Sequence, residues 1–410
     1  MLTSGERMRL RLSSQLLVLL AVGLALRLSW VAVHHVTPVS DFAEYNQHAA
    51  TLVTHGNYSD NPRYSDAYWE PGWPVVLAAL YSVFGVHPLL GAVLGTLLEW
   101  GAIVVAAVAA SRLLRPRFAT LSVAAMCLYP GAIAYGPVLG TEHLAALLFT
   151  AVVVLVALAQ PTSRTALTAG LLAGASILTR SEYGAATVVL IAVWLWRALP
   201  MRRVVNVATV SAAGALICLG PWIARNAITF GEFIPASTNG GVTFYLGTVS
   251  PRYTEPPIVK RLGDTSTRHP AAHDEMWLRM GLRNVIDNPL RWLAFDVQRI
   301  PYQYGQETLL LNWGRINNPV ARRVANIYWL TIVALALIGV GSMIAARRQV
   351  LPAWWLIAGS IAAVSLLKTA FIVNQRDRLP LTYLLILIAG LGTQRLADLI
   401  AARARRLESR

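Results

Sequence analysis

The amino-acid sequence predicts an all-α polytopic membrane protein, a bundle of about ten transmembrane helices. Of its 410 residues, 56% are hydrophobic and only 13% are charged, a balance far from that of a soluble globular domain. Several apolar stretches approach the roughly 20 residues that a helix needs to cross a bilayer. The net charge is +15, but the arginines gather at the ends of the apolar stretches, as they do in oriented membrane helices. We therefore expect the lipid bilayer as a partner, and no nucleic acid.

The apolar stretches place the spans within a single domain of residues 1–410. They cover about 16–33, 88–110, 118–136, 142–159, 165–179, 183–197, 204–222, 324–345, 350–372 and 379–397. The first stretch follows a basic segment, as in a signal peptide, but it is long, carries Arg27 and lacks a small-x-small cleavage site. We therefore expect an uncleaved helix. Residues 71–86 are apolar but short, which indicates a helix packed at the outer membrane surface.

Arginine also sets the predicted orientation. Because arginine-rich loops tend to stay in the cytoplasm, the short, arginine-rich loops and both termini are predicted to lie on the cytoplasmic side of the plasma (inner) membrane. Two longer segments then lie outside: a first extracytoplasmic loop, 34–87, with juxtamembrane helices, and a large loop, 223–323. All eight histidines and most carboxylates lie in or next to the outer segments. We therefore expect the active site on the extracytoplasmic side.

Acidic residues crowd the first outer loop of this basic chain. They are Asp41, Glu44, Asp60, Asp66 and Glu70, against a single Arg63. Asp41 opens a predicted amphipathic helix and Glu44 follows three residues later, which is the spacing of a capping box. Two interpretations stay open: Asp41 caps a helix on the membrane surface, or it is a catalytic base fixed beside the bilayer.

Further charged residues border the predicted spans. Glu142 begins the fourth span, where either a helix dipole or catalysis explains it. Arg180 and Glu182 flank the outer end of the fifth, where long side chains also snorkel to the interface. Lys368 lies about one turn inside the end of the ninth span and is followed by Arg376 and Arg378. Three cations at an outer surface favour a bound anion, and a lipid-linked phosphate is the obvious candidate.

No cofactor is predicted. The two cysteines, Cys127 and Cys218, lie in apolar stretches, so there is no disulfide framework and no CxxC motif. His34 with His35, and His269 with His273, do not have the spacing of a closed metal site. The sequence neither supports nor excludes a bound divalent metal ion.

Four blocks of the sequence resemble a known family. They are Asp41, Tyr45 and Gly56 with Glu70-Pro71-Gly72-Trp73-Pro74; Leu139-Gly140-Thr141-Glu142; 221–226 continued by 230–241; and Arg376-Asp377-Arg378-Leu379-Pro380-Leu381. On these blocks, which span about 41–390 in the family's order, the chain resembles the GT-C superfamily of integral-membrane glycosyltransferases. The resemblance is to the family 39-like branch, which includes bacterial protein mannosyltransferases and the lipid A aminoarabinose transferase.

The resemblance implies an inverting glycosyltransferase that moves a sugar from a polyprenyl-phosphate donor to an acceptor hydroxyl or amine-type group outside the cytoplasm. Asp41 matches the family's catalytic carboxylate, and Glu142 matches a second acidic residue. Developing negative charge on the leaving phosphate needs fixed cations. The candidates for the donor phosphate are Arg225, Lys368, Arg376 and Arg378. The candidates for the sugar and acceptor are Tyr45, Glu70, Arg180, Glu182 and Asn239.

The resemblance leaves both the sugar and the acceptor open; the acceptor is a lipid, a glycan or a protein. The chain carries no sizeable soluble C-terminal domain, and Glu70 stands where the family often has a basic residue or histidine. Two other functions are alternatives. A transporter or flippase of a lipid-linked sugar places charges near the midplane and often has two related halves, neither of which the sequence shows. A non-catalytic assembly factor is the third alternative.

Overall fold

The computed structural model describes residues 13–254, 256–262, 268–311, 314–347 and 349–408. The basic N-terminal residues Arg7, Arg9 and Arg11 lie outside the described residues. The helices, in chain order, are α1 (Ser14–Val33), α2 (Asp41–His55), α3 (Gly72–Phe84), α4 (Pro88–Leu113), α5 (Pro116–Cys127), α6 (Pro130–Tyr135), α7 (Glu142–Leu158), α8 (Ser163–Thr179), α9 (Ser181–Ala198), α10 (Met201–Phe230), α11 (Gly240–Val249), α12 (Pro257–Leu262), α13 (Pro270–Asp287), α14 (Pro289–Tyr304), α15 (Pro319–Ala345), α16 (Pro352–Thr369), the 3₁₀ helix η1 (Gln375–Arg378) and α17 (Leu379–Glu408). Strands β1 (Leu310–Leu311) and β2 (Gly314–Arg315) form a short antiparallel pair.

The predicted spans are all helical, which confirms the all-α prediction. Seven helical stretches of the described residues are long and apolar enough to cross a membrane: Ser14–Val33, Pro88–Leu113, Pro116–Tyr135, Met201–Phe230, Pro319–Ala345, Pro352–Thr369 and Gln375–Glu408. The third of these is divided into α5 and α6, because Pro130 begins a new helix. Helices α7, α8 and α9 are shorter or less apolar, and they pack against the longer helices. The chain is an integral membrane protein.

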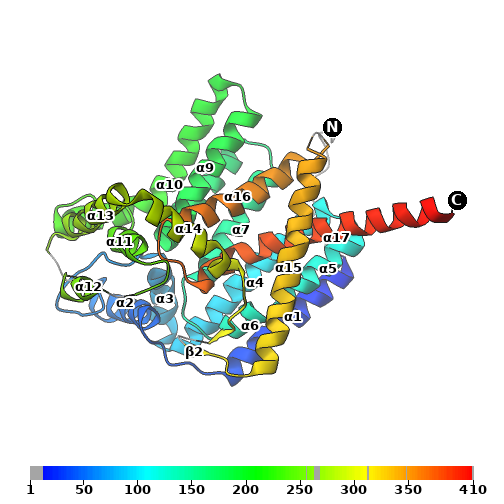
Figure 1. The fold of residues 1–410 in the computed structure, drawn as a ribbon. Coiled ribbons are helices and arrows are strands. Elements are labelled where there is room, and N and C mark those ends of the chain that lie inside the picture. The colour runs from blue at the N-terminus through cyan, green and yellow to red at the C-terminus, as the bar shows by residue number, and fades with distance from the viewer. Residues whose placement is uncertain (1–12, 255, 263–267, 312–313, 348, 409–410) are drawn as a thin grey trace.

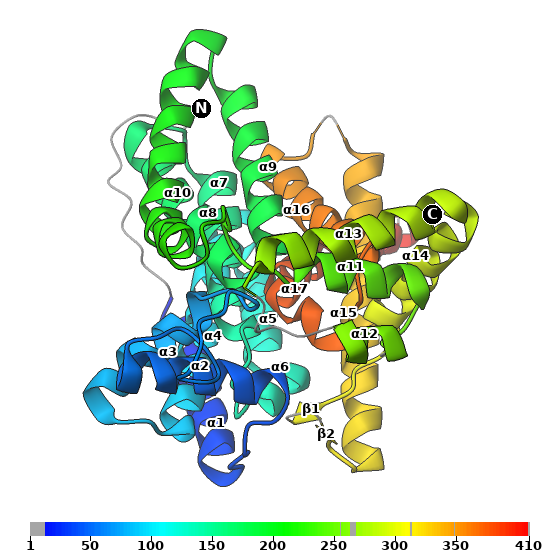
Figure 2. The ribbon, with the colours of Figure 1, turned by 90° about the vertical axis from the view of Figure 1, so that its left-hand side faces the viewer.

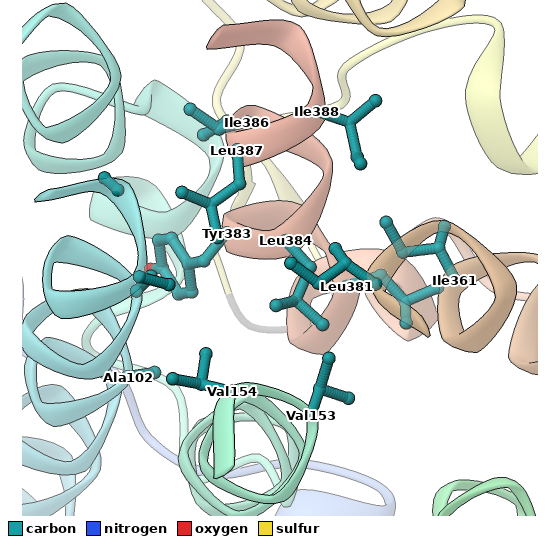
Figure 3. Packing of buried hydrophobic residues seen from close by; sticks show 14 of the residues in the cluster. Ala102, Val153, Val154, Ile361, Leu381, Tyr383, Leu384, Ile386, Leu387 and Ile388 are labelled. Carbon is teal, nitrogen blue, oxygen red and sulfur yellow. The ribbon is translucent and has the colours of Figure 1, made fainter. Parts of the chain in front are cut away.

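The main core surrounds the first half of α17. Buried α17 side chains, Leu381, Tyr383, Leu384 and Leu387 among them, pack with Ala102 of α4, Val153 and Val154 of α7 and Ile361 of α16 (Figure 3). A helix that is apolar on every side is stable only when other apolar surfaces enclose it. The start of α17 is therefore fixed from several directions, and so is η1, the turn immediately before it.

The shorter helices gather at one side of the molecule. Helices α2, α3, α11, α12 and α13 lie on the left in Figure 1, opposite the C-terminal end of α17 on the right. Figure 2 looks onto this side, with α2 and α3 (blue) apart from α11 to α14 (yellow-green). Between the two groups lies η1: Arg376 contacts Asp41 of α2, and Arg378 contacts Gln303 of α14. The starts of α7, α9 and α17 and the end of α16 also meet at η1.

Candidate active site

Asp41 lies buried at the start of α2, but its carboxylate does not cap that helix. It is the first helical residue, Ser40 precedes it as the N-cap residue, and no side-chain hydrogen bond caps α2. The Glu44 carboxylate points elsewhere and accepts a hydrogen bond from Trp69 Nε1. The capping-box interpretation is therefore wrong, because neither side chain has the partner that this motif requires.

Arg376 brings Asp41 and Glu142 to one cation. Its Nη2 donates to Oδ2 of Asp41, and its Nε lies 3.5 Å from Oε1 of Glu142. The guanidinium also covers the ring of Phe42, 4.6 Å from the ring centroid. The other Asp41 oxygen, Oδ1, is buried and has no hydrogen-bond partner among the described residues. One lone-pair site of a fixed carboxylate is thus left available.

Arg180 connects Glu142 to the rest of the cluster. Its Nη1 donates to Oε1 of Glu142 at 2.7 Å and to Thr141 Oγ1 at 3.1 Å. Its Nη2 donates to Oδ1 of Asp377 at 2.7 Å, and its Nε donates to Oε1 of Glu182 at 3.0 Å. An arginine with three carboxylate partners and 13% side-chain exposure is held inside the protein rather than snorkelling to lipid.

Lys368 completes the cluster from the end of α16. Its Nζ lies 3.0 Å from Oε1 of Glu182 and 3.2 Å from Oδ2 of Asp377. Asp377 is fixed in turn, because its Oδ2 accepts the Asn374 backbone N–H at 2.8 Å. Each predicted cation of this region therefore already faces carboxylates. We call Asp41, Glu142, Arg180, Glu182, Lys368, Arg376 and Asp377 the polar cluster.

The predicted sugar and acceptor residues border this cluster. Oε1 of Glu70 accepts a hydrogen bond from Ser181 Oγ at 2.9 Å. Burial raises the pKa of Glu70, and the neighbouring Glu182 carboxylate raises it further. Tyr45 packs edge-on against Trp69, with ring centroids 5.2 Å apart. Burial raises the pKa of Tyr45 as well, and the Asp41 charge adds to the rise.

Asn239 is the N-cap residue of α11, and its Oδ1 accepts a hydrogen bond from Ser237 Oγ at 3.3 Å. Ser237 also interacts with Glu70. Asn239 is therefore connected to the border of the cluster through one serine, and among the described residues its side chain makes no hydrogen bond to the cluster itself. Its position is consistent with a wall of the site rather than with its centre.

Two predicted phosphate-binding residues make their contacts elsewhere. Arg225 Nη1 donates to the Asp66 carbonyl at 2.7 Å, its Nη2 donates to the Tyr58 carbonyl at 3.1 Å, and its guanidinium lies 4.9 Å from the Trp222 ring centroid. Arg225 thus fastens the first outer loop onto α10. Because its donors are used by backbone carbonyls, we no longer assign it to the donor phosphate.

Arg378 is 1% exposed and belongs to a different ion pair. Its Nη2 lies 3.1 Å from Oε2 of Glu307, its Nη1 donates to the Gln303 carbonyl, and its guanidinium lies 4.1 Å from the Trp329 ring centroid. Tyr129 donates to the same Glu307 oxygen. We therefore also withdraw Arg378 from the phosphate site, since its charge is neutralised inside the protein.

Two members of the site escaped the sequence analysis. Asp377 holds Arg180 and Lys368 together, and Tyr135 donates a hydrogen bond to Oε2 of Glu142 at 2.6 Å. Asp377 lies between two arginines, and an acid in that setting is a signal for a structural ion pair. Tyr135 carries no comparable signal. No group of three or more His, Cys, Asp or Glu side chains suited to a metal occurs among the described residues.

The comparisons with known proteins rest on structure alone. No family's sequence profile matches the chain. No curated protein sequence matches it either. Among solved structures it is similar to the oligosaccharyltransferase AglB from Archaeoglobus fulgidus in complex with an inhibitory peptide and a dolichol-phosphate, with a TM-score of 0.54 and 11% identity over 97% of this chain and 52% of that one.

Two further structures are similar. The Archaeoglobus fulgidus oligosaccharyltransferase in complex with Zn and sulfate matches with a TM-score of 0.53 and 13% identity, over 95% of this chain and 50% of that one. ArnT from Cupriavidus metallidurans bound to undecaprenyl phosphate matches with a TM-score of 0.49 and 16% identity, over 93% of this chain and 78% of that one. The chain spans about half the length of the oligosaccharyltransferases. The fold is thus the GT-C fold of integral-membrane glycosyltransferases.

Proposed function

We propose that the protein is an inverting glycosyltransferase that takes a sugar from a polyprenyl-phosphate donor. The GT-C fold supports the general class, because structures with this fold include transferases solved with dolichol-phosphate. A fold alone does not define an activity. The assignment therefore depends on what the polar cluster can do.

The observation that carries the proposal is the state of the Asp41 carboxylate. Arg376 holds Oδ2, while Oδ1 is buried and has no hydrogen-bond partner among the described residues. Leaving a buried acceptor unpaired costs roughly 1–3 kcal/mol, so such an atom calls for an explanation. A general base must keep one lone pair free for the proton that it removes. Asp41 meets this requirement, with its orientation fixed by the guanidinium.

In the proposed reaction Asp41 Oδ1 removes the proton from the acceptor hydroxyl. The acceptor oxygen then forms a bond to the anomeric carbon, and the bond from that carbon to the phosphate oxygen breaks. The polyprenyl phosphate leaves with the electron pair. A single displacement inverts the anomeric centre.

The leaving phosphate must be met by cations that can reach it. Arg180 and Arg376 are the most exposed cations of the polar cluster, with 13% and 12% of their side chains accessible. Lys368 is 8% exposed and lies between two carboxylates. We therefore assign the phosphate to Arg376 and Arg180, with Lys368 positioning Glu182 and Asp377. Glu142 bridges the two arginines and keeps them side by side.

The proposal also includes the side of the membrane. The polar cluster lies at helix ends on the side that carries the first outer loop, and the arginine-rich loops lie at the other ends of the same helices. The active site then faces the extracytoplasmic space, where the donor, and a lipid, glycan or protein acceptor, would reach it.

One experiment tests the assignment. Membranes that contain the protein are given undecaprenyl phosphate loaded with a panel of radiolabelled sugars, and release of the sugar from the carrier is measured. We expect consumption of at least one donor, and a loss of at least about 100-fold in Asp41→Asn, because an amide cannot act as a base. Asp60→Asn, a loop residue that accepts a hydrogen bond from Tyr64, is the control. Near-normal turnover in Asp41→Asn would exclude Asp41 as the base.

A further inference from the structure

Helix α14, in the large loop, buries two polar side chains and exposes four apolar ones. Arg299 and Gln303, one turn apart, are both fully buried. The apolar side chains are 46% to 80% exposed, and they are Leu290, Leu293, Val297 and Ile300, which we call the α14 stripe. A helix at the surface of a soluble protein does the reverse, with its apolar side toward the core. The α14 stripe therefore needs a partner outside the chain.

The exposed surface of α14 has two sides. The α14 stripe covers a sector of about 80° around the helix axis, at 3.6 residues per turn. Arg291 and Gln298 are also exposed, and they lie together in a second sector, roughly 130° from the stripe. Arg299 and Gln303 occupy the third sector, which faces the protein. A helix at a membrane surface that also packs on protein has this arrangement, because one exposed side meets acyl chains and the other meets water.

Contacts with the last turn of α16 set the level at which α14 lies. Arg299 Nη1 donates to the Thr369 carbonyl at 2.5 Å, and the Tyr304 hydroxyl lies 2.5 Å from Ser365 Oγ. Helix α16 is one of the helices apolar enough to cross a membrane, and Thr369 is its final residue. The second half of α14 therefore runs beside the end of a span. Leu366, in the same turn of α16, is 65% exposed, so the apolar outer surface of that span extends to the level of α14.

The rotation of α14 about its axis is fixed by the same arginine. Besides its contact with α16, Arg299 Nη2 donates to the Gly247 carbonyl and to the Ser250 carbonyl, the latter at 2.8 Å. Its Nη1 also donates to Oδ1 of Asp296 at 2.8 Å. A guanidinium held by acceptors from three segments keeps one side of α14 toward the protein. The α14 stripe is thus held outward, and α14 lies at the edge of the molecule in Figure 2.

The size of the α14 stripe favours lipid over a second protein. A stable protein–protein interface needs roughly 20–30 residues on each side. Four side chains on one helix fall far short of this number. They suit the acyl chains of a bilayer, which cover any apolar surface and need no matching shape.

We propose that the α14 stripe is embedded in the lipid leaflet on the side of the polar cluster. The large loop 223–323 then lies partly in the membrane, and α14 holds it there. Lys368 belongs to the same turn of α16 as Thr369, so the polar cluster comes to lie at the level of the lipid headgroups. This inference goes beyond the proposed function and does not rest on it.

The test measures the surroundings of single labels on α14. With Cys127 and Cys218 replaced by alanine, Leu293→Cys and Gln298→Cys each receive a nitroxide, and the full chain is reconstituted in nanodiscs that hold one copy. Leu337→Cys is the lipid reference, because Leu337 lies in the span α15 and is 68% exposed. Power-saturation EPR gives the collision rates of each label with oxygen, which concentrates among acyl chains, and with a water-soluble nickel chelate.

We expect the Leu293→Cys label to resemble the Leu337→Cys label. Its ratio of oxygen to nickel collisions should be at least about threefold higher than that of the Gln298→Cys label, which faces water. All three native side chains are exposed, so the labels displace no buried contact. Retention of the unlabelled Tm confirms that each labelled protein is folded.

Three results would overturn the inference. If the α14 stripe is a docking face for a second copy or another protein, a single copy leaves the Leu293→Cys label in water, and its ratio equals that of Gln298→Cys. Low collision rates with both reagents would place the stripe inside the protein. A lipid-like ratio at both positions would contradict the two-sided arrangement. None of these measurements uses a sugar donor, so such a failure leaves the glycosyltransferase proposal as it stands.

Discussion

Arg376 donates a hydrogen bond to Asp41 although 335 positions separate the two residues in the chain. The first outer loop is thereby fastened to the turn that precedes the last helix. Because α17 is enclosed by the core, the turn is rigid, and the orientation of Asp41 depends on it. The same guanidinium reaches Glu142, so one side chain positions both candidate catalytic carboxylates.

We predict that Arg376→Gln lowers kcat by at least about 100-fold, because it removes the charge that fixes Asp41 and that we assign to the leaving phosphate. Arg376→Lys should recover only part of the loss, since an ammonium lacks the planar fork that meets two carboxylates. Single-turnover rates with a labelled donor check this. In the control, Arg115→Gln, an exposed pair with Asp398 is lost, and activity should stay within about twofold of wild type. Equal activity of Arg376→Gln and wild type would contradict the assignment.

Arg378 gives a different expectation, since its charge lies inside the protein. Arg378→Met leaves Glu307 buried without its cation, which typically costs about 3–5 kcal/mol. We expect a marked loss of Tm in detergent, and partial recovery in the double variant Arg378→Met/Glu307→Gln. Unchanged Tm together with weaker binding of sugar-free undecaprenyl phosphate would return Arg378 to the phosphate site.

The His48–Asp66 pair predicts a pH dependence of stability. Nε2 of His48 lies 3.0 Å from Oδ2 of Asp66, and its Nδ1 lies 2.7 Å from the Glu44 carbonyl, so both ring nitrogens face acceptors. Burial alone would lower the pKa of His48, but the hydrogen bond and charge of Asp66 outweigh it and raise that pKa above 6.5. The stabilisation is therefore complete below pH 6.5 and is lost as the pH rises through the folded-state value.

In His48→Gln this part of the pH dependence should disappear. Tm measured in detergent at half-unit steps from pH 5.5 to about 9 checks it. The wild type should become less stable toward the alkaline end, and the variant should change less over the same steps. Parallel curves for the two proteins would show that His48 is neutral in the folded state.

The proposed orientation is tested by accessibility of single cysteines, with Cys127 and Cys218 first replaced by alanine. Arg63→Cys, in the first outer loop, should react with an impermeant maleimide in intact cells. Ser163→Cys, at the start of α8, should react only after the membrane is opened. Labelling of Ser163→Cys in sealed cells would reverse the orientation and place the polar cluster in the cytoplasm.

Hydropathy was enough to predict that the apolar stretches are helices, although about ten spans were expected and seven helical stretches of the described residues are long and apolar enough to cross a membrane. A span needs about 20 apolar residues whatever its neighbours are, so this signal is local. The break between α5 and α6 was not predicted, because the apolar stretch 118–136 is continuous in hydropathy although Pro130 divides it. Asp41 was likewise singled out as a candidate from local composition, because an acidic loop in a basic chain is unusual.

The pairing of charges was not predictable in this way. Arg376 and Arg378 look equivalent in the sequence, yet they contact α2 and Glu307 respectively. They lie in a 3₁₀ helix, where each residue turns the side chain by about a third of a revolution, so residues two apart point in different directions. Which cation meets which carboxylate depended on that local twist and on contacts between distant helices. The snorkelling interpretation of Arg180 failed for the same reason, since its partner Asp377 is 197 positions away.

The order in which the chain is synthesised bears on this last contact. Glu142 and Arg180 are only 38 positions apart, so they can pair as soon as α7 and α8 have entered the membrane. Asp377 is made much later, after α16 has brought in Lys368. Until then Arg180 and Lys368 lack one of their final partners, and Asp41 has no guanidinium to hold it. We therefore expect the proposed catalytic site to stay incomplete until η1 and α17 are in place, because these contacts need Arg376 and Asp377.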